Sequence, residues 1–336
     1  MTLIPPRFMY LPMLAMMAGF TVQAALAGAF VSACADEAAN PFQPGYEGRG
    51  KGQGAIDFDA AFEACRAAAE SDPDNMDVQA WLARLHYLQN DFEAMFPGIE
   101  RSAEAGNAMA QQILGDVLVV GKGVDIDLQK SAEWLKASAA SGYPLGQYSL
   151  AMSYLFGDGV EADAAAAAAL YAAAAQQGYA QAKRELGVLY LEGRGVPEDS
   201  AMARTLFEAA AEEGERLAML DLGDLYLHGM GVEADFETAI AWGERAEAAG
   251  ETSASQWLAL AYLGEEGNPV DLDLAEEWAR RAIEAGDNYG HVVLGYIDEE
   301  GLAGEPDLDA ARAHFEAGAA LGEEEAIEAL ARLKEE

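Results

Sequence analysis

The chain has 336 residues, and 51% of them are hydrophobic, so it is long enough to bury a sizeable core. Its 58 acidic residues outnumber 20 Lys and Arg, which gives a formal net charge of −38 at pH 7. This balance disfavours nucleic acid as a partner, because a phosphate backbone needs basic stripes. We expect the acidic surface to keep the chain in solution, and the alternative is attraction to a basic partner or cation.

Residues 1–35 are predicted to direct export. No charged residue occurs between Phe8 and Ala35, and Arg7 precedes this apolar stretch, as in a secretory signal. Three outcomes stay open: cleavage after Ala27 or Ala35, lipidation of Cys34 at a sequence that resembles a bacterial lipobox, or an uncleaved membrane anchor. Each would place the remaining chain outside the cytoplasm, in the periplasm, with membrane contact only through this segment or a lipid.

Residues 36–56 are rich in Gly and Pro, which predicts a flexible linker. The only two cysteines, Cys34 and Cys65, lie near it. A disulfide between them is permitted in an oxidising compartment if cleavage occurs upstream of Cys34.

Residues 57–106 keep a helical rhythm and are predicted to cap the N-terminal end of the array that follows. Pro73 favours a helix end just before it, and Trp81, Leu82, Leu85 and Leu88 mark the next helix. This region resembles a tetratricopeptide repeat.

Residues 107–322 are predicted to form six repeats of 36 residues. Glycine recurs at this period, at Gly106, Gly142, Gly178, Gly214, Gly250, Gly286 and Gly322. Eight residues after each glycine comes a leucine that Gly or Ala follows, with another small residue four positions before it. These spacings place the small residues on one face of a helix, where a second helix approaches closely. A unit of this size cannot bury its apolar face alone, so the repeats must stack.

Each first helix is predicted to end at a turn of the type Gly-x-Gly-Val, where glycine supplies a positive φ. An aspartate then recurs every 36 residues, at Asp127, Asp163, Asp199, Asp235, Asp271 and Asp307. We expect these aspartates to cap the second helices, because one carboxylate per repeat is too sparse for a calcium site. The fifth and sixth units depart at the turn, with Glu265, Asn268 and Pro269 in the fifth and Gly301 in the sixth.

These positions together resemble the Sel1-like repeat, a relative of the tetratricopeptide repeat. Residues 179–214 carry the full pattern, YAQAKRELGVLYLEGRGVPEDSAMARTLFEAAAEEG. The resemblance implies an all-α, right-handed α/α solenoid of stacked helix-turn-helix units, which residues 323–336 would close with a capping helix.

The resemblance also implies a non-catalytic scaffold of the cell envelope that binds a partner protein or peptide on its concave face. With Leu186 and Tyr190 facing inward, the opposite side of each first helix supplies the candidate binding residues. These are Met152, Phe156, Glu185, Glu192, Asp221, Asp224, His228, Trp257, Tyr289 and Tyr296. The alternative for Trp257 is packing between neighbouring repeats.

No catalytic constellation is visible in the sequence. The histidines His86, His228, His291 and His314 share no motif, and we expect no metal, no cofactor and a monomer. The alternative function is a penicillin-binding or β-lactamase-like envelope hydrolase, as reported for cysteine-rich Sel1 proteins. Those proteins pair cysteines within each repeat, whereas residues 107–322 contain none.

Overall fold

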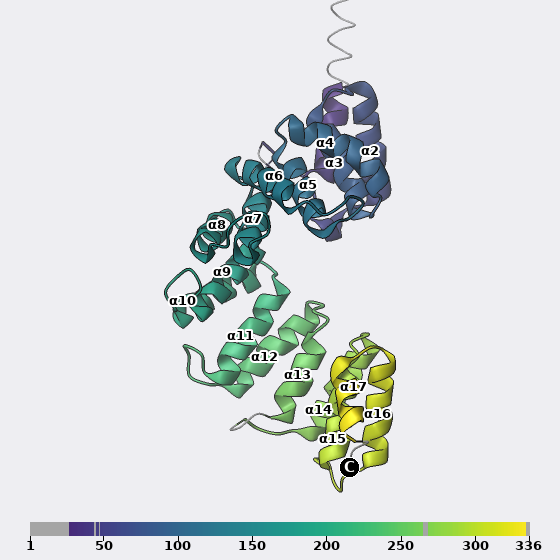
Figure 1. Cartoon of the computed structure of the whole chain (residues 1–336), viewed down its shortest axis with the longest axis vertical. Helices are drawn as coiled ribbons and strands as arrows, with labels where there is room; N and C mark the ends of the chain where they lie inside the picture. Colours follow the sequence, from purple (N-terminus) through teal and green to yellow (C-terminus); the bar gives the residue numbers. More distant parts are fainter. Residues whose placement is uncertain (1–26, 44, 47, 265–267, 334–336) are drawn as a thin grey trace, which may run out of the picture. The chain divides into compact units, whose positions relative to one another are not determined.

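The computed structural model describes residues 27–43, 45–46, 48–264 and 268–333. The chain divides into two compact units, Met1–Tyr179 (unit 1) and Ala180–Glu336 (unit 2), and we treat each by itself. The described residues form helices joined by short loops and contain no strand, which confirms the all-α prediction (Figure 1).

Unit 1 begins with helical residues 27–38 and continues with a short 3₁₀ helix and seven α-helices. These are η1 (Gln53–Ala55), α2 (Phe58–Ser71), α3 (Met76–Leu88), α4 (Phe92–Glu104), α5 (Ala108–Val120), α6 (Leu128–Ala140), α7 (Pro144–Phe156) and α8 (Ala164–Gln176). The helix end expected before Pro73 is confirmed, since α2 ends at Ser71.

Unit 2 contains nine described helices that continue the same alternation. These are α9 (Ala180–Glu192), α10 (Ser200–Glu212), α11 (Arg216–His228), α12 (Phe236–Ala248), α13 (Ala254–Leu263), α14 (Leu272–Glu284), α15 (Tyr289–Glu300), α16 (Leu308–Ala320) and α17 (Glu324–Arg332). The last of them is the predicted capping helix, while Glu335 and Glu336 lie outside the described residues.

The recurring aspartates cap the second helices, as predicted. In all six repeats the carboxylate accepts a hydrogen bond from a backbone N–H in the first turn of the helix that follows. The closing glycines are confirmed as joints, because all seven adopt a positive φ between 81° and 92°.

The small residue after the recurring leucine leaves space for a large side chain of the second helix. A Cβ atom at Gly187 would lie 2.6 Å from Cε1 of Phe207, and one at Gly295 would lie 2.4 Å from Cε1 of Phe315. The close helix approach predicted from the sequence therefore occurs, and it leaves no room for a side chain at these glycines.

The turn of the fifth repeat differs from the others. Gly264 has φ 78° and ψ 129°, whereas Gly121, Gly157 and Gly229 take the left-handed conformation that closes a helix. Glu265 lies outside the described residues. The sixth turn keeps a left-handed cap at Gly301 despite its changed sequence.

Residues 36–56 differ from the predicted flexible linker, because they pack against α3. Ala38, Ala39 and Gln43 are buried, and the guanidinium of Arg84 donates hydrogen bonds to the carbonyls of Ala38, Ala39 and Lys51. Gly and Pro disfavour regular helix but do not prevent burial when a partner surface satisfies the backbone.

A disulfide joins Cys34 to Cys65 and ties the helical residues 27–38 to α2. Cys34 is fully buried in the unit 1 core. A lipid on Cys34 would need the same sulfur, so lipidation and this disulfide exclude each other, and cleavage after Ala35 would remove Cys34. Among the described residues, no helix combines the length and the apolar character needed to cross a bilayer.

Candidate functional site

The candidate residues follow one strip that repeats along the first helices. We define the first-helix strip as the second, fifth, sixth and ninth residues of a first helix, counted at the 36-residue period. In α11 these are Leu217, Leu220, Asp221 and Asp224, and in the next repeat they are Ser253, Gln256, Trp257 and Leu260. Their 3.6-residue periodicity places them on one side of each helix.

In unit 2 this strip forms a groove across α9, α11 and α13. The groove has a volume of about 280 Å³, and apart from Arg184 and Ser253 its lining comes from residues 217–224 and 256–260. Leu217 and Leu260 are each 39% exposed, although large aliphatic side chains are usually buried. The structure therefore brings Asp221, Asp224 and Trp257 of the predicted set into one cavity.

A charged cluster forms one wall of the groove. Arg184 donates to both carboxylate oxygens of Asp221 at 2.6 and 3.1 Å, and to Glu185 at 2.9 Å. Burial raises the pKa of Asp221 to about 6, against the opposing effect of Arg184, and the charges of Asp224 and Glu185 add to the rise. Burial likewise raises the pKa of Glu185. Keeping these carboxylates ionised in the folded chain therefore costs free energy.

Trp257 has the packing role considered from the sequence, and it also lines the groove. Its ring fills the space beside two glycines, since a Cβ at Gly223 or Gly243 would lie 2.7 or 2.6 Å from it. Gly243 stands where four other second helices carry Leu135, Tyr171, Phe207 or Phe315 and α14 carries Ala279. In this repeat the ring of Trp257 fills the space that a large side chain of α12 would take. Its indole Nε1 donates to Oδ1 of Asp224 at 2.7 Å, which fixes that carboxylate at the groove.

The other predicted residues of unit 2 lie outside this groove. Glu192 pairs with Arg194, and His228 is exposed at the end of α11. Tyr289 and Tyr296 both donate to the carboxylate of Glu325 in the capping helix, at 2.7 and 3.2 Å. These tyrosines therefore bind the end of the chain itself, a contact that no repeat pattern indicated.

In unit 1 the strip is covered by the chain's own N-terminal segment. Helices α3 and α5 align on their N-caps Asn75 and Asn107, so the strip of α3 consists of Asp77, Ala80, Trp81 and Arg84. Trp81 donates from Nε1 to Gln43 at 2.7 Å, and Tyr46 donates to Asp77 at 3.1 Å. Together with the bonds from Arg84 to three carbonyls, these contacts bind residues 38–51 to the strip.

Met152 and Phe156, the two predicted residues of unit 1, are not part of this contact. Met152 is half-buried, while Phe156 is 66% exposed near the end of α7. Sequence reasoning missed Trp81 and Arg84 as strip residues because the turn after α3 lacks Gly-x-Gly-Val and shifts the period from 36 to 32 residues.

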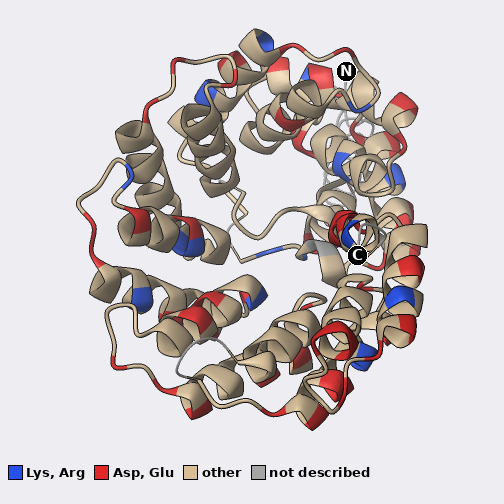
Figure 2. Ribbon diagram, turned by 60° about the horizontal axis from the view of Figure 1, so that its bottom comes forward, with Lys and Arg blue, Asp and Glu red and all other residues tan. Residues whose placement is uncertain are grey.

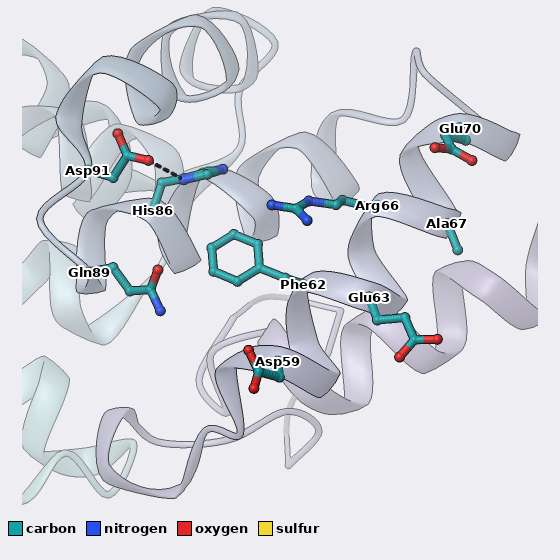
Figure 3. Close-up of a pocket in the computed structure, with 9 residues that line it drawn as sticks. All are labelled: Asp59, Phe62, Glu63, Arg66, Ala67, Glu70, His86, Gln89 and Asp91. Carbon is teal, nitrogen blue, oxygen red and sulfur yellow. Dashed lines mark hydrogen bonds and ion pairs between the residues drawn. The ribbon is translucent and has the colours of Figure 1, made fainter.

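A second cavity, of about 560 Å³, lies between α2 and the end of α3 (Figure 3). Phe62 and Arg66 project from α2 toward His86, whose Nδ1 lies 3.1 Å from Asp91. The ring centres of Phe62 and His86 lie 4.9 Å apart with the rings tilted by 60°, and the guanidinium of Arg66 lies 5.1 Å from the Phe62 ring centre. The aromatic and charged side chains that line this cavity thus contact one another, and these contacts stabilise the packing of the helices.

Acidic residues are spread over helices and loops of both units, and basic residues are fewer (Figure 2). In the part of the chain that the structure describes, no three His, Cys, Asp or Glu side chains gather as a metal site would need. The arrangement of the unit 2 groove, with aliphatic, aromatic and charged groups side by side, is suited to binding.

Solved structures similar to this chain carry the same repeat. A Sel1 repeat protein from Oxalobacter formigenes is 27% identical, with a TM-score of 0.62 over 71% of this chain and 96% of that one. The protein c5321, described as a protective antigen in uropathogenic Escherichia coli strains, is 26% identical with a TM-score of 0.59 over 82% of this chain. This chain spans 59% of the length of c5321.

The Cut9–Hcn1 hetero-tetramer of the APC/C, at 14% identity and a TM-score of 0.55, shares the fold alone. No curated protein sequence matches this chain. The Sel1 repeat model matches residues 108–143, 144–179, 180–215, 216–251, 257–287 and 289–323, within one residue of the expected boundaries in the first four units. These matches cover more than half of the chain, which therefore belongs to the Sel1 repeat family.

Proposed function

We propose that this chain is a non-catalytic interaction scaffold of the bacterial cell envelope, which binds a partner protein along the first-helix strip of unit 2. The observation that carries the proposal is the groove across α9, α11 and α13, where Leu217 and Leu260 are exposed beside Asp221 and Asp224. Repeat folds of this kind generally present such surfaces to other proteins.

The strip in unit 1 supports a polypeptide as the ligand. There the same positions bind residues 38–51 of the chain itself through side-chain and main-chain hydrogen bonds. A strip that binds a polypeptide segment in one unit is suited to bind one in the other. The groove volume of about 280 Å³ also fits one or two side chains better than a cofactor, because cofactor and drug-sized sites start at about 300 Å³.

The disulfide supports export. Disulfides persist in oxidising compartments such as the bacterial periplasm, and the bond between Cys34 and Cys65 closes the N-terminal part of unit 1. Cleavage after Ala27 would keep helical residues 28–38, which include Cys34, and the hydrogen bonds from Arg84. We therefore favour this position over cleavage after Ala35 or a lipid on Cys34, and mass spectrometry of the intact protein from its native envelope distinguishes the three.

Site-specific photocrosslinking in the native envelope tests the scaffold. A photoreactive residue in place of Gln256, which lines the groove, should capture a protein, and one in place of the exposed Glu212 on α10 should not. Capture at residue 212 but not at residue 256 would contradict binding at the groove.

The hydrolase alternative has a separate test. We expect labelled penicillin to leave the purified chain unmodified. The hydroxyl of Ser253, which lines the unit 2 groove, donates to the carboxylate of Glu251 at 3.0 Å, and a carboxylate is a weaker base than the imidazole that activates a serine nucleophile. Covalent labelling would overturn the non-catalytic proposal.

A further inference from the structure

The charges around the unit 2 groove indicate which chemistry its partner must carry. Arg184 donates to Glu185 and Asp221, while the charge of Glu215 also acts on Arg184 and that of Asp224 on Asp221. This cluster of one guanidinium and four carboxylates carries a net charge of −3. The chain as a whole carries −38, so the surrounding field has the same sign. An anionic segment would be repelled here, whereas a cation would relieve the repulsion among the carboxylates.

Asp224 is positioned to receive that cation. Its Oδ1 accepts from the indole of Trp257 at 2.7 Å, and the Trp257 ring is itself fixed between Gly223 and Gly243. A carboxylate has about four lone-pair positions, so it can accept from the indole and from an ammonium or guanidinium group together. A carboxylate already fixed by packing loses little freedom when it binds a ligand.

Apolar surface lies on both sides of this carboxylate. Leu217 precedes Asp224 by two turns of α11, and Leu260 occupies the same strip position as Asp224 one repeat later. Both leucines are substantially exposed, and they line the groove together with Trp257. A bulky apolar side chain of a partner would bury this surface against water.

The strip of α3 in unit 1 shows how the hydrogen-bonding role of the ninth residue matches that of the segment bound to it. At the ninth strip position α3 carries Arg84, a donor, and its ligand presents carbonyl acceptors. At the same position α11 carries Asp224, an acceptor. The matching group of a unit 2 ligand is therefore a donor.

We propose that the unit 2 groove binds an extended segment of another protein in which a Lys or Arg lies next to a bulky apolar residue. The cation binds Asp224, and the apolar side chain packs on Leu217 and Leu260. This inference rests on the proposed function and adds the chemical class of the partner.

Peptide binding tests the chemistry directly. Labelled peptides of about eight residues would reach across three helices, at about 3.3 Å per residue and 8–10 Å between helices. Fluorescence anisotropy with the full chain would compare a central Leu-Lys-Phe sequence with Leu-Glu-Phe and Ser-Lys-Ser. We expect the first to bind at least about tenfold more tightly than either of the others, because each control lacks one of the two contacts.

Paired variants locate the binding. Asp224→Asn keeps an acceptor for Trp257 and should weaken Leu-Lys-Phe binding about tenfold, since a hydrogen bond to a charged group is lost. Leu260→Ser should weaken it about fivefold through lost apolar contact. Glu212→Gln and Leu321→Ser change an exposed acid and an exposed leucine away from the groove and should have no effect.

Equal binding of Leu-Glu-Phe, or binding that Asp224→Asn leaves unchanged, would overturn the inference. Mass spectrometry of the segment crosslinked at residue 256 shows whether the partner chemistry alone is wrong or the groove binds no protein at all. A captured segment without Lys or Arg would refute the basic-partner chemistry and leave the scaffold standing, whereas no protein captured at residue 256 would refute the groove as a binding surface.

Discussion

The strip positions of α3 in unit 1 bind another segment of the chain, whereas those of α11 and α13 in unit 2 line a groove. This difference shows which features follow from the repeat and which depend on individual residues. On α3, Trp81 and Arg84 bind residues 38–51 of the chain. On α11 and α13, Asp224 and Trp257 bind each other and line a groove. In unit 1 the tryptophan and the charged residue both come from α3, whereas in unit 2 Trp257 comes from α13 and the ninth-position charge, of opposite sign, from Asp224 of α11.

The most disruptive change should be Trp257→Ala, which separates the packing role of the unit 2 strip from its binding role. Trp257 is half-buried, and its ring fills the space at Gly223 and Gly243, where truncation leaves a gap; truncation of a Trp in a core costs about 3–5 kcal/mol. We expect amide hydrogen exchange measured by mass spectrometry to show α11–α13 opening more often, while α3–α5 in unit 1 is unaffected.

A second substitution checks the cause. Gly243→Leu alone should also destabilise unit 2, because its side chain would meet Trp257. Combined with Trp257→Ala it should restore about half of the loss, as the leucine refills the space from α12. If the double variant loses as much stability as the two single variants together, the leucine does not refill the space left by Trp257, and the explanation is wrong.

The disulfide should contribute the next largest effect, and only in unit 1. It closes a loop with a sequence separation of 31, for which the chain-entropy model gives about 3.7 kcal/mol. Cys34→Ala with Cys65→Ala should therefore increase amide exchange across residues 27–56 and α2. Reduction of the unchanged protein with dithiothreitol should have the same effect, whereas the double variant should not respond to it.

Arg84→Met should release residues 38–51 from the unit 1 strip. The change removes the donor to the carbonyls of Ala38, Ala39 and Lys51 and costs about 2–3 kcal/mol. Limited proteolysis should then cut between residues 40 and 52, where the unchanged protein should resist cleavage. Arg280→Met, at an exposed arginine of α14, is the matched control, and equal resistance of both variants would mean that Arg84 does not hold the segment.

Much of the fold could be predicted from the sequence, because the repeat makes each helix boundary a recurrent signal. The aspartate caps and closing glycines are set by local backbone chemistry, so their positions alone identified them. The departure at Gly264 was also visible as a break in the pattern.

The contacts that depend on non-repeated residues could not be predicted in this way. Residues 36–56 lack a helical period, and their burial depends on Arg84 and Trp81, which lie outside the 36-residue frame. The sequence shows a glycine at residue 243, where most other second helices carry a large side chain, but only the structure shows that Trp257 fills the space. The bonds from Tyr289 and Tyr296 to Glu325 could not be predicted either, because Glu325 is a non-repeated residue at a strip position of the capping helix.

The smallest expected effect concerns Asp116, which occupies the ninth strip position of α5, equivalent to Arg84 and Asp224. Burial raises its pKa to about 6, although hydrogen bonds from Ser149 and Gln112 and the charge of Lys122 oppose the rise. Because this value lies above the ordinary 3.8, the folded chain binds a proton more tightly than the unfolded chain between pH 4 and 6. The contribution of this group to stability therefore falls as the pH rises through that window.

Asp116→Asn removes the cost of a buried charge and should stabilise unit 1 at pH 7 by about 1 kcal/mol, after allowance for its partial exposure to solvent. The advantage should shrink below pH 6, where the carboxyl of the unchanged protein is protonated. Asp221 has a similarly raised pKa in unit 2, so the pH dependence of amide exchange in α11 should stay the same in this variant. An equal gain at pH 4 and pH 7 would mean that the asparagine improves packing and that the strip of α5, unlike that of α11, carries no strained charge.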